Sequence, residues 1–247
     1  MVYGDAPYLE ALTAIVREHG TLYAWASSQP QPRALRGRAP VYVAQLPAVR
    51  TAVVVRHSWH GGLLAPLTRD MFRRPTRAPL EFNQSRQLRA LAIPTTEVLG
   101  YALYQAPFGL ARVDVVSRYV EHTADLGMVL ANLVPAVAGD AALEATLTLL
   151  GQLARHGVVH PDLNVKNILL HTPSDAPPLA MVIDVDVATI GGVSPARAMA
   201  RNVARLERSL HKWNRQFGSD VSDARIAAFA QSALARVPAA SAAGDAS

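Results

Sequence analysis

One short stretch constrains this chain more than any other: HGVVHPDLNVKNILL, residues 156–170. It brings a His, an Asp and two Asn together between His160 and Asn167, and an apolar run, 168–170, follows directly. A core strand has no place for such a polar cluster, and a solvated loop has no need of the apolar residues around it. The pattern therefore predicts a loop that flanking core residues hold rigidly, with its polar side chains directed at a ligand.

A second polar segment, MVIDVD, places Asp184 directly after three apolar residues. Phosphoryl transfer requires a carboxylate that deprotonates an attacking hydroxyl, together with an amide oxygen and a second carboxylate that hold Mg²⁺ on the nucleotide phosphates. We assign Asp162 as the catalytic base, and Asn167 and Asp184 as the metal ligands. His160, counted with the catalytic residues, is expected to brace the loop and the metal-binding segment.

The spacing of these residues resembles the protein-kinase-like signature H-x-D-L-x-x-x-N followed by a D-x-G segment. The chain departs from that signature at Pro161, where many protein kinases have Arg, and at Val185 and Asp186, which replace Phe and Gly. No Ala-Pro-Glu segment and no long activation loop follow. These departures favour a kinase of a small molecule or glycan over a regulated protein kinase.

The first half of the chain should supply a cation for the nucleotide phosphates. Arg56 ends the strand-like segment TAVVVR, where a kinase would carry Lys, and Glu81 in the next helix is its expected partner. Arg neutralises phosphate, although its forked geometry differs from the point charge of Lys. We assign Arg56, Glu81 and Asn164 to nucleotide binding. The glycine-rich loop expected before the strand is reduced to Gly37.

Strand patterns dominate the first half of the chain and helix patterns the second, which predicts an α+β, protein-kinase-like bilobal fold. The N-lobe, 1–120, should hold an antiparallel sheet with one main helix, plus an amphipathic helix at the N-terminus. The C-lobe, 121–236, should be mainly helical, and the tail, 237–247, disordered. The expected strands are 41–46, 51–56, 98–105, 112–119, 168–170 and 179–183. The expected helices are 81–92, 126–133, 141–155 with Asp140 as N-cap, 194–217 and 220–236.

Composition narrows the class of protein further. The chain has no Cys, which excludes a disulfide framework and a thiolate metal site. The N-terminus lacks the pattern of a secretion signal, and no stretch is long and apolar enough for a membrane span. The net charge of +5 favours anionic partners. Basic and aromatic residues do not interleave as in nucleic-acid-binding proteins, so no nucleic-acid partner is expected.

Several strings together resemble the lipopolysaccharide kinase group, and within it the 3-deoxy-D-manno-octulosonic acid (Kdo) kinases, over about residues 35–215. The strings are GRAPVYV, VVVRHSWHGGL, LEFNQSRQLRALAIPTTEVLGYALY, HPDLNVKNILL, IDVD and ARNVARLERSLHKW. The matching residues include Arg56, His57, Gly61, Gly62, Asn202, Arg205, Leu206, Arg208, Ser209 and Leu210.

This resemblance implies transfer of the γ-phosphate of ATP, with Mg²⁺, to a sugar hydroxyl of Kdo-lipid A in lipopolysaccharide core biosynthesis. It implies a cytoplasmic protein, peripheral on the cytoplasmic face of the inner membrane, with no obligate protein partner. A basic loop is the expected contact with the anionic membrane surface. Its residues are Arg69, Arg73, Arg74 and Arg77.

Two other functions remain open at this point. A heptose kinase, or another small-molecule or protein kinase of the same fold, would share most of these motifs. A nucleotide-binding pseudokinase with a scaffolding role is the other, because the strand that should carry the phosphate-binding Lys carries Arg56 instead.

Overall fold

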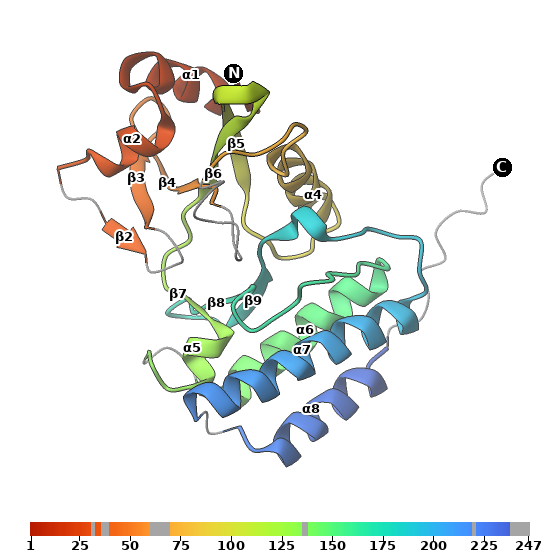
Figure 1. Cartoon of the computed structure of the whole chain (residues 1–247). Helices are drawn as coiled ribbons and strands as arrows, with labels where there is room; N and C mark the ends of the chain where they lie inside the picture. Colours follow the sequence, from red (N-terminus) through yellow and green to blue (C-terminus); the bar gives the residue numbers. More distant parts are fainter. Residues whose placement is uncertain (31–32, 36–39, 60–69, 135–137, 219–220, 238–247) are drawn as a thin grey trace. The chain divides into compact units, whose positions relative to one another are not determined.

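The computed structural model describes residues 1–30, 33–35, 40–59, 70–134, 138–218 and 221–237. The chain divides into two compact units, Met1–Arg86 with Thr96–Tyr119, and Gln87–Thr95 with Val120–Ser247 (Figure 1). Some expectations fall on residues outside the described ranges. These are Gly37, Gly61, Gly62, Arg69 and nearly all of the tail, 238–247.

The first unit is built on a six-stranded antiparallel sheet in the order β1-β5-β6-β4-β3-β2. The strands are β1 (Val2–Gly4), β2 (Arg33–Leu35), β3 (Val41–Leu46), β4 (Thr51–His57), β5 (Val98–Gln105) and β6 (Ala111–Arg118). The four strands expected from alternation and β-branched residues are present within about a residue, and β3 and β4 form the predicted hairpin.

The prediction that the N-terminus begins as a helix is wrong for its first residues. Val2–Gly4 pair with β5 instead, and the helix α1 (Tyr8–His19) starts after Pro7. Two glycines allow the close pairing, because a Cβ on Gly100 would lie 2.4 Å from the Tyr3 carbonyl oxygen and one on Gly4 2.8 Å from that of Leu99. The partner strand lies far along the sequence, so local periodicity could not reveal β1.

Helices cover both faces of this sheet, and strand alternation decides which residues meet which helix. Val53 and Val55 of β4 face α1 and α2 (Leu22–Ser27) in one core cluster. Arg56, one residue on, points to the other face, where α4 (Ala78–Ala90) packs through Phe82. The expectation of one main helix besides the N-terminal one is met by α4, and α2, capped by Thr21, was not predicted.

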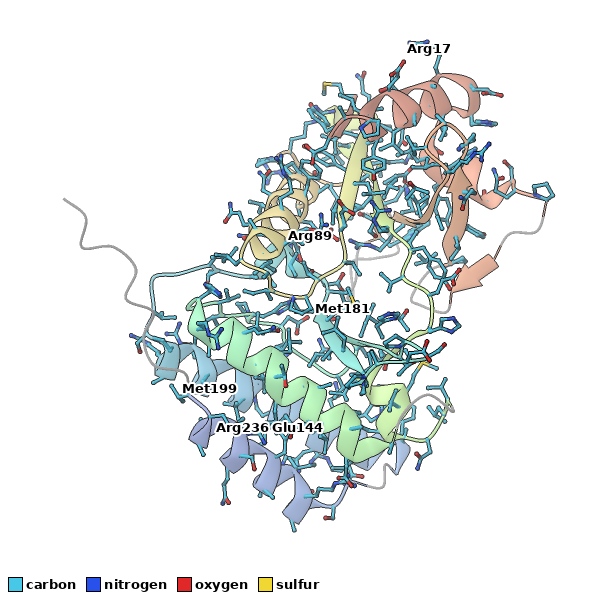
Figure 2. All side chains as sticks on the ribbon, turned by 180° about the vertical axis from the view of Figure 1, so that it is seen from behind. Arg17, Arg89, Glu144, Met181, Met199 and Arg236 are labelled. Atoms are coloured by element: carbon cyan, nitrogen blue, oxygen red, sulfur yellow. The ribbon has the colours of Figure 1, made fainter. Side chains whose placement is uncertain are left out.

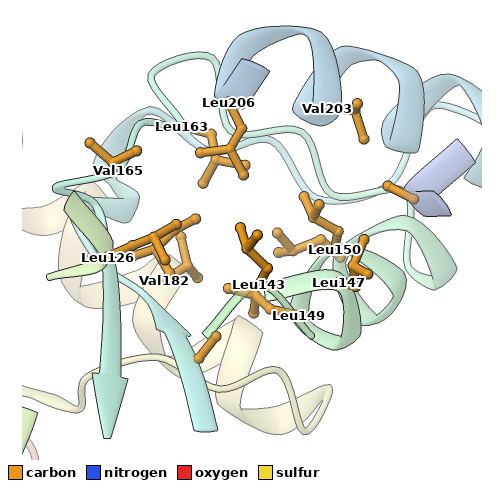
Figure 3. Close-up of a cluster of buried hydrophobic side chains, with 14 of the residues drawn as sticks. Leu126, Leu143, Leu147, Leu149, Leu150, Leu163, Val165, Val182, Val203 and Leu206 are labelled. Atoms are coloured by element: carbon orange, nitrogen blue, oxygen red, sulfur yellow. The ribbon is translucent and has the colours of Figure 1, made fainter. Parts of the chain in front are cut away.

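The second unit surrounds a larger apolar core, drawn close up in Figure 3. It contains a three-stranded sheet, β7 (Thr123–Asp125), β8 (Ile168–His171) and β9 (Leu179–Val182), and a 3₁₀ turn, η2 (Val185–Val187). Its helices are α5 (Leu126–Leu130), α6 (Gly139–Arg155), α7 (Pro195–Phe217) and α8 (Asp223–Ala235). None of the helices in the described ranges has the length and apolarity needed to cross a bilayer.

The start of α6 differs from the expectation. Its N-cap is Ala138, so the prediction of Asp140 as cap is wrong. Asp140 lies in the first turn, where its charge favours the helix dipole, and it forms an ion pair with Arg225 of α8. Arg236, just beyond α8, pairs with Glu144 of α6 at 2.5 Å, as the two labelled residues in Figure 2 indicate. The charged residues of α6 therefore hold α8 rather than cap the helix.

A buried charge cluster lies in the first unit at the end of β4. His57 Nδ1 lies 2.6 Å from Asp114 Oδ1, and His57 Nε2 lies 3.1 Å from Asp70 Oδ2. The other oxygen of Asp114, which is fully buried, accepts hydrogen bonds from the Tyr23 backbone N–H and the Tyr104 hydroxyl. We call these five residues the His57 cluster; Arg112 pairs with its Asp70 at 2.7 Å.

The cluster makes the stability of the protein depend on pH. Burial alone lowers the pKa of His57, but the hydrogen bonds and charges of Asp114 and then Asp70 outweigh it and raise the pKa above its ordinary value of 6.5. A group with a raised folded-state pKa stabilises the fold fully below its unfolded pKa, and this contribution is lost as pH rises through the folded value.

We therefore predict that the free energy of unfolding, measured in urea, declines as pH rises above 6.5 because His57 loses its proton. His57→Gln should be less stable at low pH and should flatten this decline. His19→Gln, at an exposed position, is the control and should keep the wild-type pH dependence. An unchanged decline in His57→Gln would contradict the assignment.

Candidate active site

The loop between α6 and β8 is held at its start by its backbone and in its middle by buried side chains. Gly157 turns the chain with φ of +62°, and a Cβ there would lie 2.6 Å from the Val193 carbonyl oxygen. Val159 and Thr189 exchange two backbone hydrogen bonds of 3.0 and 2.9 Å. Leu163 and Val165 are buried in the core of the second unit (Figure 3). Core residues hold this loop, as predicted from the polar cluster and the apolar residues around it.

One flank of α7 clamps the backbone of this loop. Asn202 is fully buried; its Nδ2 donates to the Val158 carbonyl at 2.8 Å, and its Oδ1 accepts from the His160 backbone N–H at 3.0 Å. Ser209 Oγ accepts from the Val165 N–H at 3.1 Å. Residues 202, 205 and 209 recur at spacings of three and four, so they share one side of the helix.

The proposed base, Asp162, has a fixed backbone and an accessible carboxylate. Its carbonyl oxygen accepts hydrogen bonds from the side-chain amides of Asn164 and Asn167, each at 2.9 Å. Its side chain is 58% exposed and pairs with Arg205 at 2.6 Å, and Arg205 Nε also donates to the Pro161 carbonyl at 3.0 Å. The carboxylate can therefore meet a substrate without a movement of the loop.

His160 connects the loop to the segment that carries Asp184. The side chain is buried, and Nε2 lies 3.1 Å from the Ile183 carbonyl oxygen. The Ile183 N–H donates to the Asn167 carbonyl at 3.0 Å. Ile183 is thus held from both sides by the loop, and Asp184 is the next residue. The structure therefore places the segments of all four predicted catalytic and metal-binding residues side by side, with His160 in the bracing position expected from the sequence.

Asp184 occupies an unusual backbone conformation. Its φ and ψ are 56° and 47°, in the left-handed region, and it begins η2 with an exposed side chain that makes no capping hydrogen bond. Asp tolerates this region better than most residues, and such strain persists only where surrounding structure enforces it. Two contacts of Val182 enforce it from the preceding strand: its N–H donates to the Pro94 carbonyl, and its own carbonyl accepts the Thr95 hydroxyl at 2.7 Å.

The donor set around Asp184 fits a hard divalent cation. The hydrogen bond to Asp162 occupies Nδ2 of Asn167, which leaves the amide oxygen as the atom of that side chain able to bind a metal. An amide oxygen and a carboxylate are oxygen ligands of the kind that Mg²⁺ prefers, usually completed by water and substrate phosphates. In the described residues, no three His, Asp or Glu side chains gather as a metal site of their own.

Two other predicted residues have clear local partners. Both polar atoms of the Asn164 side chain are engaged within the loop, Nδ2 with the Asp162 carbonyl and Oδ1 with the Lys166 N–H at 2.9 Å. In the first unit, Arg56 Nη2 lies 2.7 and 2.6 Å from the two carboxylate oxygens of Glu81. The expected Arg56–Glu81 pair is therefore confirmed, while the nucleotide-binding roles of Arg56, Glu81 and Asn164 stay predictions.

The sequence had singled out the motif around Asn202, Arg205 and Ser209 without finding what it does. The apolar side of α7 packs in the core of the second unit. The polar clamp on the loop was missed. A polar residue at a position of the helix that apolar periodicity predicts to be buried, as at Asn202, was the available signal.

We predict that Asn202→Leu destabilises the protein by about 2–6 kcal/mol, because the Val158 carbonyl and the His160 N–H would both lose their buried partner, at about 1–3 kcal/mol each. Urea unfolding followed by tryptophan fluorescence, to which Trp213 on the same helix contributes, measures the change. Gln216→Ala, at an exposed position of α7, should lie within about 0.5 kcal/mol of wild type. Equal stabilities of the two variants would refute the clamp.

Comparisons with known proteins agree with this geometry. A curated 3-deoxy-D-manno-octulosonic acid kinase from Xanthomonas oryzae pv. oryzae (strain PXO99A) is 30% identical over 186 residues, 71% of this chain and 68% of the relative. Kinases of the same description from Xylella fastidiosa (strain M12) and Pasteurella multocida (strain Pm70) are 28% and 29% identical. Those alignments cover 76% and 64% of this chain, and 73% and 65% of the relatives.

The fold is also that of a solved structure described as WaaP in complex with acyl carrier protein. The TM-score is 0.53 at 18% identity, and the match covers 96% of this chain and 90% of the other. The predicted α+β, kinase-like fold is thus confirmed. The sequence matches the family description over residues 29–232, and the chain belongs to the lipopolysaccharide kinase (Kdo/WaaP) family, a family of phosphotransferases.

Proposed function

We propose that the protein is an ATP-dependent kinase that phosphorylates a hydroxyl of the Kdo sugar in Kdo-lipid A during lipopolysaccharide core assembly. The observation that carries the proposal is the exposed carboxylate of Asp162 on a loop that is bonded, through Ile183, to the segment of Asp184. Family membership and the Kdo kinases among the relatives support the sugar acceptor.

In this proposal Asp162 accepts the proton of the acceptor hydroxyl, and the oxygen of that hydroxyl attacks the γ-phosphorus of ATP. The bond from that phosphorus to the bridging oxygen breaks, and ADP leaves. Arg205 holds one oxygen of the Asp162 carboxylate, which leaves the other for the hydroxyl. Asn167 and Asp184 would hold Mg²⁺, which neutralises charge on the phosphates. A catalytic step of this kind depends on positioning and electrostatics more than on covalent chemistry by the protein.

In the first unit we propose that Arg56, oriented by Glu81, binds the α- and β-phosphates in place of Lys. Both carboxylate oxygens of Glu81, which is largely buried, accept from Nη2 of Arg56, and this contact supports the substitution because it holds the positive charge of Arg56 in one place on β4. It also weakens the main argument for a pseudokinase, which was the missing Lys. We propose further that the protein works on the cytoplasmic face of the inner membrane, as a peripheral protein.

We predict that Asp162→Asn lowers the rate of phosphate transfer from Mg-ATP to Kdo-lipid A by about 10²–10⁴-fold, the range expected for loss of a general base. Mass spectrometry of the glycolipid measures the added phosphate and locates it on the sugar. Asp175→Asn, an exposed carboxylate in the turn after β8, is the control and should keep wild-type activity.

If the wild type binds Mg-ATP without phosphorylating Kdo-lipid A, the proposed acceptor is wrong. Transfer to a heptose-containing core instead would identify the alternative kinase, and no transfer to either would favour the scaffold.

We predict that Asp184→Asn and Asn167→Ala remove most of the effect of Mg²⁺ on ATP binding, because the first replaces a negatively charged ligand of the metal by a neutral amide and the second removes the amide oxygen. The measurement is ATP affinity by calorimetry with and without Mg²⁺, compared with wild type. Affinity without the metal should change little in either variant. An unchanged Mg²⁺ effect in both variants would exclude these residues as ligands.

A further inference from the structure

The exposed side of α7 carries a row of basic residues that the fold leaves unused. Five of them are exposed and recur at intervals of four, seven, four and three residues, which places them on one side of the helix. They are Arg197, Arg201, Arg208, Lys212 and Arg215. We call this row the α7 basic stripe. At about 1.5 Å per residue it extends over about 27 Å.

The stripe has no carboxylate partners anywhere in the described part of the chain, although other arginines of the same unit do. Three ion pairs show this: Arg205 with Asp162, Arg225 with Asp140, and Arg236 with Glu144. The opposite side of α7 packs against α6 and α8, which lie beside it in Figure 1. The helix thus has its apolar side covered, while five neighbouring positive charges repel one another without compensation.

The stripe runs beside the candidate active site. Arg205, which holds Asp162, lies four residues after Arg201 and three before Arg208, so it occupies the edge of the stripe nearest the loop. An anionic surface that contacts the stripe is therefore brought next to the accessible carboxylate of Asp162.

The chemistry of the stripe indicates what kind of surface this is. The exposed residues between its charges are small, including Ala200 and Ala204, and offer no large apolar or aromatic anchor of the kind that dominates protein–protein interfaces. A straight row of flexible basic side chains, without a large apolar residue among them, is complementary to a flat surface that carries negative charge throughout. An anionic bilayer has this property.

We propose that the α7 basic stripe is the surface by which the protein docks on anionic lipid headgroups. The proposal rests on the proposed function, because a membrane-embedded acceptor requires the site to reach the bilayer. It replaces the basic loop around residues 73–77 as the main contact. Docking is electrostatic and shallow, so it weakens as ionic strength rises.

The test is binding of the full-length protein to vesicles of neutral phosphatidylcholine with and without phosphatidylglycerol, measured by co-sedimentation at low and high salt. Wild type should bind the anionic vesicles only, and less at high salt. Arg201→Gln with Arg208→Gln and Lys212→Gln should bind about 100-fold more weakly, at roughly five-fold per removed charge. Arg73→Gln with Arg74→Gln and Arg77→Gln changes the net charge equally and should bind nearly as wild type.

The proposal is overturned if wild type does not bind anionic vesicles, or if the loop variant loses as much binding as the stripe variant. Thermal unfolding of the stripe variant should match wild type, because the stripe residues are exposed and have no ion pair in the described structure. The assay contains no ATP and no Kdo, so a failure here is distinct from a failure of the proposed reaction, which the Asp162→Asn assay reports.

Discussion

The candidate active site depends on one buried amide. Asn202 sits in the core of the second unit with no exposure, and it uses one polar atom on Val158 and the other on the backbone of His160. A buried amide without hydrogen bonds would cost about as much free energy as several favourable contacts contribute. The helix and the loop therefore take the mutual position in which both polar atoms of Asn202 are hydrogen-bonded. This position fixes the backbone of the loop at residues 158 and 160.

Because the backbone of His160 is held, its ring reaches the carbonyl of Ile183, and Ile183 is held in turn by Asn167. The strained conformation of Asp184 is supported by this connection and by the strand before it. The rigid parts of the site are therefore backbone and buried side chains, and the groups that would react remain exposed. Catalysis by positioning requires this division, because a carboxylate must be accessible and yet held in place.

The ion pair of Asp162 with Arg205 belongs to the exposed part of the site. Pairs of this exposure contribute little to stability, on the order of 0–1 kcal/mol, because water screens them. Such a pair can be exchanged for a substrate contact at little cost. The same helix thus contributes a rigid clamp through Asn202, an exchangeable contact through Arg205, and an uncompensated row of charges beside them.

Much of the site was predictable from sequence because its information is local. The spacing of His160, Asp162 and Asn167 indicated their chemistry. The cation that a kinase carries on a strand, and the carboxylate it carries in the first turn of the next helix, indicated that Arg56 pairs with Glu81. The clamp of α7 and the strand β1 were not predictable, since they depend on contacts between distant segments. The predicted N-cap of α6 was wrong, because the helix begins at Gly139 after Ala138 and Asp140 lies in its first turn.

The central claim is that the loop of Asn167 and the segment of Asp184 form one oxygen-ligand site beside Asp162. Crystals grown with Mn²⁺ and a non-hydrolysable ATP analogue would test it, since anomalous scattering locates the metal directly. The account predicts an anomalous peak for one metal ion that is coordinated by Asn167 Oδ1 and the Asp184 carboxylate. Asp162 should lie outside the coordination sphere of this metal, and the terminal phosphate should lie near it. A metal bound elsewhere in the protein, or one that contacts neither residue, would contradict it.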